Sequence, residues 1–510
     1  MKKKIIAVLL SFFVLGLFLR VLYLPQKALT FGYDQARDAF VSGQILKGDL
    51  KILGPSASTP GLYHGVFYYY LLAPAYLIGQ GNPIVATIWI ALLNALGLFV
   101  VYLLTYKLTR KVSVSLLASF LYTISFEAVQ YALWLSNPST AIWSVPLIYL
   151  GLWVWLKEKK NWGAILCAIA LGLSIQAEIF LAYHLVPVLL WLVLLRKEVN
   201  KKSLILFIGS LIAALSTMIL VEFKFGFKSL HGMASLFLGQ DLFINARGFG
   251  DFIVLYLNQF GKIFRNAIFP TNEGYAGVLG LTATIIIILG YLKKKKKEIL
   301  SWEMFTLTYL LSHLTVVSVG GVSTPTLTIG LLVPAIIFAS YLLIVIYEKK
   351  KFWAIFILVI IMVANLSKVI LEDSKGQSLF AVQKEFVLSD ELKVLDYTYQ
   401  EAKGEPFSIN TITNPLWINT TWSYLYNWYG QKKYGKLPEW HGRDQVGQLG
   451  NNLPSTSSST KLYFLIVEPT QGIPEVWITR EKEGEDSKSK LIEDKSFGKI
   501  HVQKRERVAI

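Results

Sequence analysis

Two carboxylates and a guanidinium are spaced for joint chemistry near the N-terminus. They lie in the stretch Phe31-Gly-Tyr-Asp-Gln-Ala-Arg-Asp-Ala39. In a helix, Asp34, Arg37 and Asp38 would stand at positions i, i+3 and i+4 and share one face. Such a group can bind a hydroxyl, a phosphate or a metal, and Arg37 would favour the ionised form of Asp34 that a general base requires. A simple salt bridge at the start of an exposed helix fits the same spacing.

A histidine opens the second pattern. His64-Gly65 lies at the start of an aromatic and apolar run that extends from Tyr63 to Gly79. The run is too short for a membrane span, and Tyr is enriched at membrane surfaces, so we expect an interfacial helix. His64 could contact a phosphate at the level of the lipid headgroups. The alternative is a polar residue that merely reaches towards water at the membrane boundary.

Further polar side chains occur in or near the outer halves of apolar runs. Ionisable groups are costly in a bilayer, so each is a functional candidate. These residues are Glu127, Gln130, Gln176, Glu178 and His184. Asn137-Pro138 occupies a short turn and fits an ordinary turn dipeptide equally well.

The elements that must position these groups are membrane spans. The chain has 510 residues, of which 54% are hydrophobic and 16% are charged. Its apolar runs of about 20 residues can each cross a bilayer, which excludes a string of soluble domains. We expect eleven spans, at 5–24, 84–106, 112–132, 140–156, 162–176, 182–195, 203–221, 275–292, 302–319, 327–347 and 352–371. The segment 162–195 is either a hairpin of two short spans or one long helix with a re-entrant piece.

The formal charge of +17 is an orientation signal. With the N-terminus in the cytoplasm, the inward segments hold 21 basic and four acidic residues, which account for the whole net charge. The remainder sums to zero, which argues against nucleic-acid binding. The basic clusters are 2–4, 107–111, 157–160, 196–202, 293–297 and 349–351. The run Ile5–Leu24 exceeds a signal-peptide core and lacks a small-x-small cleavage site, so we expect a retained first span.

The expected domains follow from this topology. A transmembrane domain over 1–371 carries long outer loops at 25–83 and 222–274, and a soluble extracytoplasmic α/β domain covers 372–510. In the latter, the pattern predicts a helix over 381–403, a flexible loop over 454–460, and strands over 407–412, 461–467 and 475–479. Its aromatic run Trp422–Tyr429 either stacks on sugars or forms a core. The single cysteine, Cys167, excludes an intrachain disulfide and a cysteine metal site.

The order of these parts resembles a family of membrane enzymes. One span, a long outer loop with an acidic motif, interfacial helices and then many spans resemble the GT-C-fold glycosyltransferases. The similarity is to glycosyltransferase family 39 and the RgtA/B/C/D-like enzymes, a group that includes protein O-mannosyltransferases and aminoarabinose transferases. It covers residues 1 to about 370. It rests on the stretches Asp34-Gln-Ala-Arg-Asp-Ala39, His64-Gly-Val-Phe-Tyr-Tyr-Tyr-Leu-Leu-Ala-Pro74, Asn137-Pro138 and Gly172-Leu-Ser-Ile-Gln176.

This resemblance implies transfer of a sugar from a polyprenyl-phosphate donor to a glycan, lipid or protein acceptor at the outer face of the plasma membrane, with inversion. It implies that Asp34 is the catalytic base and that Asp38 supplies a second carboxylate. Candidates for binding the donor phosphate are Arg37, His64, Arg247 and Lys262. Candidates for binding substrate are Tyr33, Tyr63, Asn137, Gln176 and Glu178.

The chain also departs from the family pattern. Relatives often carry Asp-Glu where this chain has Asp34-Gln35, and a histidine close to the position of Glu178. The turn 320–325 lacks the basic or aromatic residues often found there. The sequence identifies no cofactor with certainty, and it leaves a divalent metal open without indicating one. Two other functions fit a polytopic chain: a transporter or flippase of lipid-linked sugars, although no inverted repeat is evident, and a non-catalytic protein of envelope glycan assembly.

Overall fold

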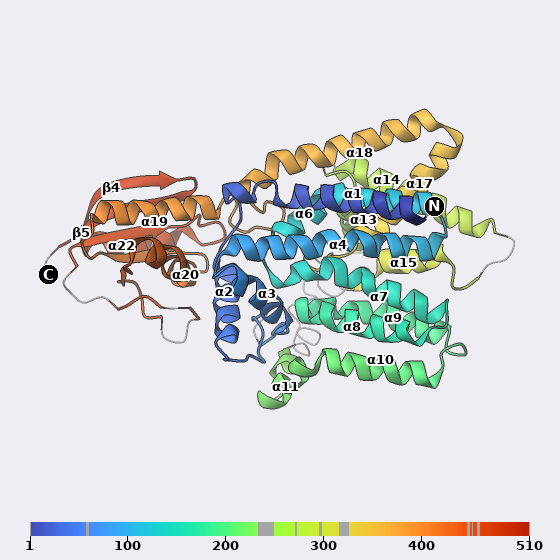
Figure 1. Ribbon diagram of the computed structural model, residues 1–510, viewed down its shortest axis with the longest axis horizontal. Coiled ribbons are helices and arrows are strands. Elements are labelled where there is room, and N and C mark those ends of the chain that lie inside the picture. Colours follow the sequence, from blue (N-terminus) through green and yellow to red (C-terminus); the bar gives the residue numbers. More distant parts are fainter. Residues whose placement is uncertain are drawn as a thin grey trace.

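The chain folds into a long helical part and a smaller part with a β-sheet at one end of it (Figure 1). The computed structural model describes residues 2–57, 61–232, 249–270, 273–294, 298–315, 326–445, 449–450, 452–455 and 460–508. The helical part is the expected all-α membrane region, because a backbone in a bilayer satisfies its hydrogen bonds within helices. The sheet lies in the C-terminal region, as the sequence predicts.

Apolar helices form the membrane region. Among the described residues, five are long and apolar enough to cross a membrane, or seven if each of two bent pairs forms one span. The five are α1 (Lys2–Val21) with η1 (Leu24–Gln26), α4 (Pro83–Thr109), η2 (Asn137–Thr140) with α7 (Ala141–Leu156), α17 (Leu332–Lys349) and α18 (Lys351–Glu372). The chain is therefore a multi-pass membrane protein.

The expected count of eleven spans is not established, because the apolar parts of the remaining helices are shorter than the 18 residues taken as the minimum for a span. These helices are α8 (Asn161–Ala177), η3 (Ile179–His184) with α9 (Leu185–Leu194), α14 (Glu273–Leu292) and α15 (Trp302–Leu311). The uncertain segment 162–195 is a pair of helices that turns at Glu178. The predicted span 302–319 reaches only Leu311 as α15, and residues 316–325 lie outside the described part.

Two predicted spans are bent rather than straight. The first divides into α5 (Val112–Ile124) and α6 (Phe126–Leu133), and the second into α10 (Lys201–Ala214) and α11 (Ser216–Lys224). The bends are 50° and 59°. At the first bend, side-chain bonds replace the interrupted helical ladder. There the amide of Phe126 donates to Asn365 Oδ1 at 2.9 Å.

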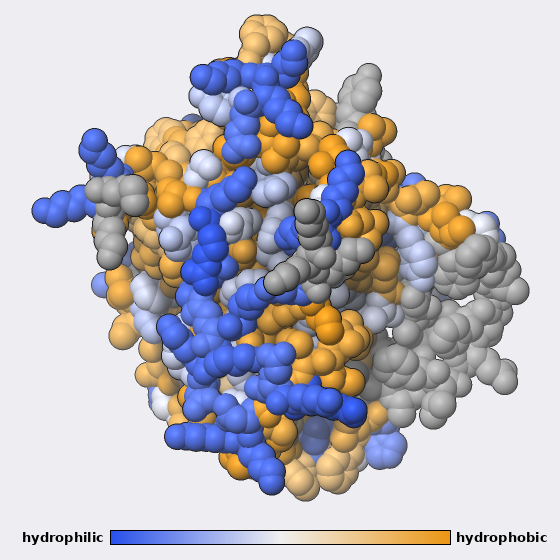
Figure 2. Space-filling view, turned by 90° about the vertical axis from the view of Figure 1, so that its right-hand side faces the viewer, coloured by the Kyte–Doolittle hydropathy of each residue, from blue (hydrophilic) through white to orange (hydrophobic). Residues whose placement is uncertain are grey.

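The basic clusters meet at one end of the helical part, which we call the basic end. Ion pairs join neighbouring clusters: Lys107 with Glu158 at 2.7 Å, Lys111 with Glu348 at 3.9 Å, Lys157 with Glu298, and Lys159 with Glu198. Figure 2 looks at this end and shows a band of hydrophilic residues across a largely hydrophobic surface. The N-terminus lies here too (Figure 1). The sequence prediction that these clusters share one side of the membrane agrees with this arrangement.

Two short helices cover the opposite end of the bundle. They are α2 (Tyr33–Leu46) and α3 (Phe67–Ile78), and α2 lies crosswise to α4 (Figure 1). Ser42 on α2 donates to the carbonyl of Tyr69 on α3 at 3.0 Å, which fixes the pair together. A helix is present where the sequence predicted an interfacial one, but it begins at Phe67 rather than Tyr63. In the second long loop the described part contains α13 (Phe249–Ala267).

The C-terminal part contains one five-stranded sheet with the order β2-β1-β3-β5-β4. Strand β1 runs parallel to β2 and β3, whereas β5 is antiparallel to both β3 and β4. The strands are β1 (Ser408–Ile412), β2 (Glu439–Trp440), β3 (Leu462–Val467), β4 (Ser489–Phe497) and β5 (Ile500–Arg507). The helices are α19 (Leu388–Ala402), α20 (Thr420–Leu425), η6 (Tyr426–Gly430), α21 (Gln431–Tyr434) and α22 (Glu475–Asp486).

Several predictions in this region need correction. The strands predicted at 407–412 and 461–467 exist as β1 and β3, but the strand predicted at 475–479 is wrong, because those residues begin helix α22. The predicted helix over 381–403 begins only at Leu388. The β4–β5 hairpin was not predicted. Of the predicted loop 454–460, residues 456–459 lie outside the described part.

Hydrogen bonds tie the C-terminal part to the segment just before α2. The amide of Leu388 donates to Leu29 O at 2.8 Å, and that of Ser389 donates to Lys27 O at 3.1 Å. The amide of Gln377 donates to Thr30 Oγ1 at 2.9 Å. Because these bonds end a few residues before Tyr33, they fix the direction in which α2 begins.

Candidate active site

The first turns of α2 carry the acidic motif. The helix begins after Gly32, whose amide donates to the Gln35 side chain at 2.9 Å, so Gln35 closes the N-terminal turn. Arg37 Nη1 donates to Asp34 Oδ1 at 2.6 Å. Its Nε and Nη2 lie 2.9 Å and 2.7 Å from Asp38 Oδ1. The structure therefore brings all three predicted residues together around one guanidinium.

The two carboxylates differ in exposure. The side chain of Asp34 is 55% exposed, whereas that of Asp38 is fully buried. Burial raises the pKa of Asp38 to about 7, although the charge of Arg37 opposes this shift. Asp38 Oδ2 has no hydrogen-bond partner within the described structure. Asp34 is therefore the acid that a substrate can reach, whereas Asp38 pairs with Arg37 on its buried side.

Aromatic rings surround this ion pair. The guanidinium of Arg37 lies over the Tyr33 ring, 5.6 Å from its centroid. Burial raises the pKa of Tyr33, which keeps its phenol neutral. Tyr69 of α3 is buried, and its pKa is raised by burial and then by Asp38. Tyr69 was not among the predicted site residues, since it is the middle residue of a Tyr-Tyr-Tyr run in which only the packing distinguishes one ring from another.

His64 lies in the segment before α3, close to the same ion pair. Its Nδ1 accepts a hydrogen bond from the amide of Ile179 at 3.2 Å and lies 3.7 Å from Glu178 Oε1. Burial lowers the pKa of His64 to about 4, and the charges of Arg37 and Asp34 act on it as well. The imidazole is therefore neutral at pH 7, and its proton sits on Nε2 because Nδ1 accepts. His64 can act as a hydrogen-bond donor, but not as a cation.

Gln176 and Asn137 hold backbone segments in place. Gln176 accepts from the amide of Phe67 at 3.1 Å and donates to Ala214 O at 2.5 Å. Its own carbonyl accepts from the amide of Gly65 at 2.8 Å. Asn137 donates to Ala177 O at 2.5 Å. These bonds use both ends of the Gln176 amide, so the structure gives the two residues positioning roles beside the site.

The remaining predicted residues lie in different places. Glu178 is buried, which raises its pKa to about 7, and its Oε1 accepts from the amide of Phe180 at 3.4 Å. Tyr63 is half-buried and forms a β-bridge with Ser56. Lys262 of α13 lines a separate cavity of about 140 Å³ with Glu127. Arg247 lies outside the described residues.

A metal site was not indicated by the sequence. Within the described ranges, no three His, Cys, Asp or Glu side chains are grouped so that they could hold a metal ion. The guanidinium of Arg37 stands between the two carboxylates of the motif, at the point where a cation would otherwise bridge them. The single positive charge of Arg37 is therefore shared by the two carboxylates.

A larger cavity, which we call the junction cavity, lies between α2, α3 and the C-terminal part. Its volume is about 540 Å³, and its walls include Phe40, Gln44, Tyr76, Tyr424 and Trp428. The predicted aromatic run therefore divides in two. Buried Trp422 and Tyr426 belong to the core of the C-terminal part, whereas Tyr424 and Trp428 face the cavity. Tyr424 also donates to Gly81 O at 2.6 Å, which ties the run to the end of α3.

Solved structures resemble this chain to different degrees. ArnT from Cupriavidus metallidurans, solved with undecaprenyl phosphate, has a TM-score of 0.57 at 9% identity, covering 98% of this chain and 97% of that chain. AglB from Archaeoglobus fulgidus, solved with an inhibitory peptide and a dolichol-phosphate, has a TM-score of 0.44 at 14% identity. This match covers 91% of this chain and 69% of AglB. The arabinofuranosyltransferase AftD from Mycobacteria has a TM-score of 0.45 at 13% identity. This match covers 80% of this chain and 29% of AftD.

The chain has the GT-C fold of membrane glycosyltransferases, as the resemblance in sequence implied. ArnT is a particular solved protein with which it shares this fold along nearly the whole length of both chains. No family model and no curated protein sequence matches the chain. At 9% identity the likeness concerns the fold, so the reaction must be argued from the site itself.

Proposed function

We propose that the chain is an integral membrane glycosyltransferase that moves a sugar from a polyprenyl-phosphate donor to the hydroxyl of an acceptor. The observation that carries this proposal is the half-exposed carboxylate of Asp34, held by Arg37 on a helix that covers the end of a GT-C bundle. ArnT was solved with undecaprenyl phosphate, which supports a polyprenyl-phosphate donor for this chain. A site at the end of the bundle suits a donor whose lipid remains in the bilayer.

The chemistry assigned to Asp34 is general-base catalysis. Asp34 takes the proton of the acceptor hydroxyl while the hydroxyl oxygen forms a bond to the anomeric carbon of the donor sugar. The bond between that carbon and the phosphate oxygen breaks, and its electron pair leaves with the polyprenyl phosphate. Attack from the face opposite the leaving group inverts the anomeric centre. Asp38 is a positioning residue here, because its buried carboxylate touches Arg37 rather than a substrate.

Two groups favour departure of the phosphate. Arg37 acts through its charge, because its side chain is only 7% exposed and electrostatic effects are strong in poorly hydrated surroundings. His64 acts as a neutral donor through Nε2–H, given that its Nδ1 accepts from Ile179. A neutral imidazole leaves the positive charge concentrated on Arg37. The junction cavity is the proposed site for a remote part of the acceptor.

The orientation proposed for the protein follows the positive-inside rule. The basic end faces the cytoplasm, and α2, α3 and the C-terminal part face outwards. We also propose a location in the plasma membrane, with lipid-linked sugar as donor and a glycan, lipid or protein as acceptor. The predicted domains, 1–371 for the membrane part and 372–510 for the outer part, belong to this proposal.

The test uses the full chain in membranes, a panel of labelled polyprenyl-phosphate sugars and an envelope extract as acceptor. Asp34→Asn keeps the size of the side chain but removes the base, so we expect transfer to fall about 10²–10⁴-fold. Asp49→Asn is the matched control, because Asp49 lies on the same outer segment with its side chain 56% exposed and paired to Lys51. It should transfer at the wild-type rate.

The possible results separate the proposal from its competitors. Full transfer by Asp34→Asn would overturn the assignment of the base. Label that crosses the membrane unchanged, without covalent transfer by the wild type, would instead support a flippase. If the wild type neither transfers nor translocates any donor of the panel, while envelope glycans still bind its outer part, the non-catalytic assembly function is favoured.

A further inference from the structure

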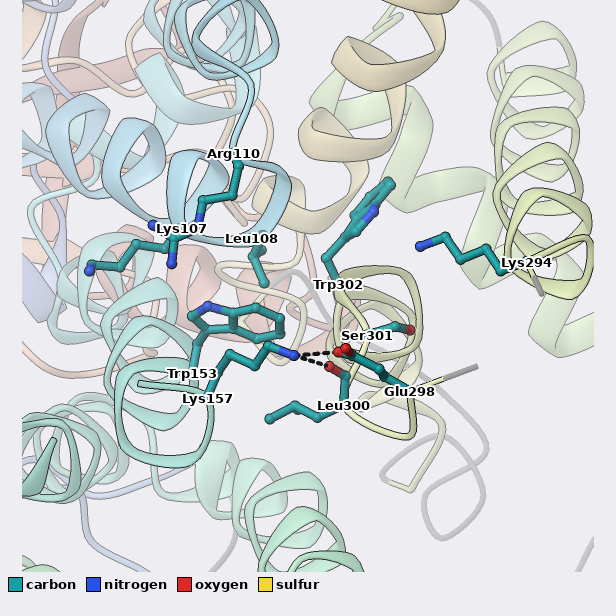
Figure 3. A pocket seen from close by; sticks show the side chains of 10 residues that line it. All are labelled: Lys107, Leu108, Arg110, Trp153, Lys157, Lys294, Glu298, Leu300, Ser301 and Trp302. Atoms are coloured by element: carbon teal, nitrogen blue, oxygen red, sulfur yellow. Dashed lines mark hydrogen bonds and ion pairs between the residues drawn. The ribbon is translucent and has the colours of Figure 1, made fainter. Parts of the chain in front are cut away.

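A second cavity lies at the basic end, far from α2. It has a volume of about 300 Å³ and is formed where the ends of α4 and α7 meet the segment between α14 and α15. Figure 3 shows Lys107, Arg110, Lys157 and Lys294 around it, contributed by three separate places in the chain. The mechanism proposed above uses none of these residues, so the cavity requires its own explanation.

The charges around this cavity do not cancel. Glu158 Oε1 lies 2.7 Å from Lys107 Nζ and 3.4 Å from Arg110 Nη2, and Glu158 Oε2 lies 3.6 Å from Lys160 Nζ. Three cations therefore share one carboxylate, and two of them, Lys107 and Arg110, line the cavity. Arg110 has its side chain 59% exposed and lies farther from Glu158 than Lys107 does, so it is free to turn towards a second anion.

The opposite side of the cavity adds no negative excess. Lys157 pairs with Glu298 and also donates to Leu300 O at 3.5 Å, as Figure 3 shows. Lys294 pairs with Glu303 at 2.6 Å. Helix α15 begins beside the cavity at Trp302, and the N-terminus of a helix carries a partial positive charge. The cavity as a whole therefore favours an anion.

Apolar walls indicate what kind of anion the cavity suits. Leu108, Trp153, Leu300 and Trp302 line it together with the basic residues. In Figure 3 the Trp153 and Trp302 rings lie on different sides of the space, among the basic groups. Tryptophan is enriched where lipid headgroups meet the acyl chains, and basic residues gather on the same side of a membrane to meet anionic lipids. A soluble phosphate would need the charges but not the apolar walls.

We propose that this cavity binds the headgroup of an anionic phospholipid, with its phosphate held near Lys107 and Arg110 and its glycerol and upper acyl region against Trp153 and Trp302. A bound lipid would join the ends of α4, α7 and α15 through one ligand. The proposal does not depend on the glycosyl transfer, because it concerns the opposite end of the molecule.

The experiment compares the full chain in nanodiscs of phosphatidylcholine with and without phosphatidylglycerol. Native mass spectrometry measures how much phosphatidylglycerol stays bound when the protein is released from the nanodiscs. Thermal unfolding measures the stabilisation that this lipid provides. Lys107→Gln with Arg110→Gln should reduce retention on the order of tenfold. Lys349→Gln with Lys350→Gln is the matched control, since it removes the same charge at the same end but away from the cavity. This control should retain the lipid as the wild type does.

Each outcome has a clear meaning. Arg110→Gln alone leaves Glu158 paired with Lys107, so it should fold normally in phosphatidylcholine and give an intermediate loss of retention. Equal losses in the cavity and control variants would overturn the proposal, since any surface charge would then suffice. Inorganic phosphate is added to phosphatidylcholine discs as a further arm. Stabilisation equal to that from phosphatidylglycerol would assign the cavity to free phosphate instead.

Discussion

Asp34 and Asp38 are bound by the same guanidinium, yet only Asp34 is open to solvent. Arg37 contacts Asp34 Oδ1 at 2.6 Å and Asp38 Oδ1 at 2.7 Å, while the two side chains are 55% and 0% exposed. One turn of α2 thus separates a carboxylate that can meet a substrate from one that cannot. The two acids have the same chemical identity, and their surroundings assign them different roles.

Asp38→Asn should flatten the dependence of stability on pH. The pKa of Asp38 is raised from 3.8 to about 7 in the folded protein, so the folded state binds a proton that the unfolded state releases. This contribution to stability is complete below about pH 4 and is lost as the pH rises through 7. Asparagine carries no charge, so the stability of the variant should not fall in this way as the pH rises. Unfolding monitored from pH 4 to pH 8 measures it.

The control for this experiment is Asp49→Asn, since Asp49 is exposed and pairs only with Lys51 among its described contacts. It should keep the slope of the wild type. A variant Asp38→Asn that keeps this slope as well would show that Asp38 does not titrate in this range.

Substitution of His64 should separate its two nitrogens. Asparagine places an oxygen near the position of Nδ1 and can accept from the amide of Ile179, whereas glutamine places a donor near the position of Nε2. If Nε2–H contacts the donor phosphate, His64→Gln should retain more turnover than His64→Asn. Conversely, His64→Asn should unfold at the higher temperature, because it keeps the bond to Ile179. Turnover and unfolding temperature are measured on the same preparations.

The reverse order in turnover would mean that His64 acts only by holding the segment around Ile179. The pH profile is a second check. Because the pKa of His64 is lowered to about 4, the wild type should show no loss of activity through deprotonation of this residue between pH 6 and 8.

Gly65→Ala should be destabilising by about 1–3 kcal/mol, as overpacking of a filled site is. A Cβ at Gly65 would lie 2.5 Å from the Gln176 side chain, which is held in turn by Phe67 and Ala214. Gly209→Ala is the control, because a Cβ there meets nothing within 4 Å in the described structure. Chemical unfolding should distinguish the two. Equal stability of both variants would show that the segment before α3 adjusts without cost.

Trp428→Ala should weaken acceptor binding while leaving the chemical step intact. Trp428 faces the junction cavity, and removal of an aromatic wall raises KM when the group it contacts is remote from the reacting atoms. Trp477→Ala is a control in the same part of the chain, since Trp477 lines a different cavity and is 41% exposed. Initial rates at several acceptor concentrations provide the test. A fall in kcat with unchanged KM would remove the junction cavity from the acceptor site.

The boundaries of several elements depended on more than local pattern. The run Glu475–Thr479 has the β-branched and aromatic composition of a strand, yet it forms the start of α22. The place beside β3 is taken by β5, which pairs along its length with β4. Strand β4 lies at the edge of the sheet, where seven of its nine residues are exposed and four are charged, so its sequence lacked the alternation that identifies a strand.

The sequence by itself determined the properties that are local along the chain. Apolar length predicts the membrane helices, the basic clusters predict which ends lie together, and the i, i+3, i+4 spacing places Asp34, Arg37 and Asp38 on one face. Each follows from helix geometry or from the cost of charge in a bilayer.

Only the tertiary structure decided how these groups are surrounded. It buries Asp38 and exposes Asp34, makes His64 an acceptor for Ile179 and so a neutral donor, and directs Trp428 towards α2 while Trp422 enters a core. These properties depend on contacts between residues up to several hundred positions apart, such as Leu388 with Leu29. Burial and hydrogen-bond direction arise from such packing, and the spacing of residues along one segment does not contain them.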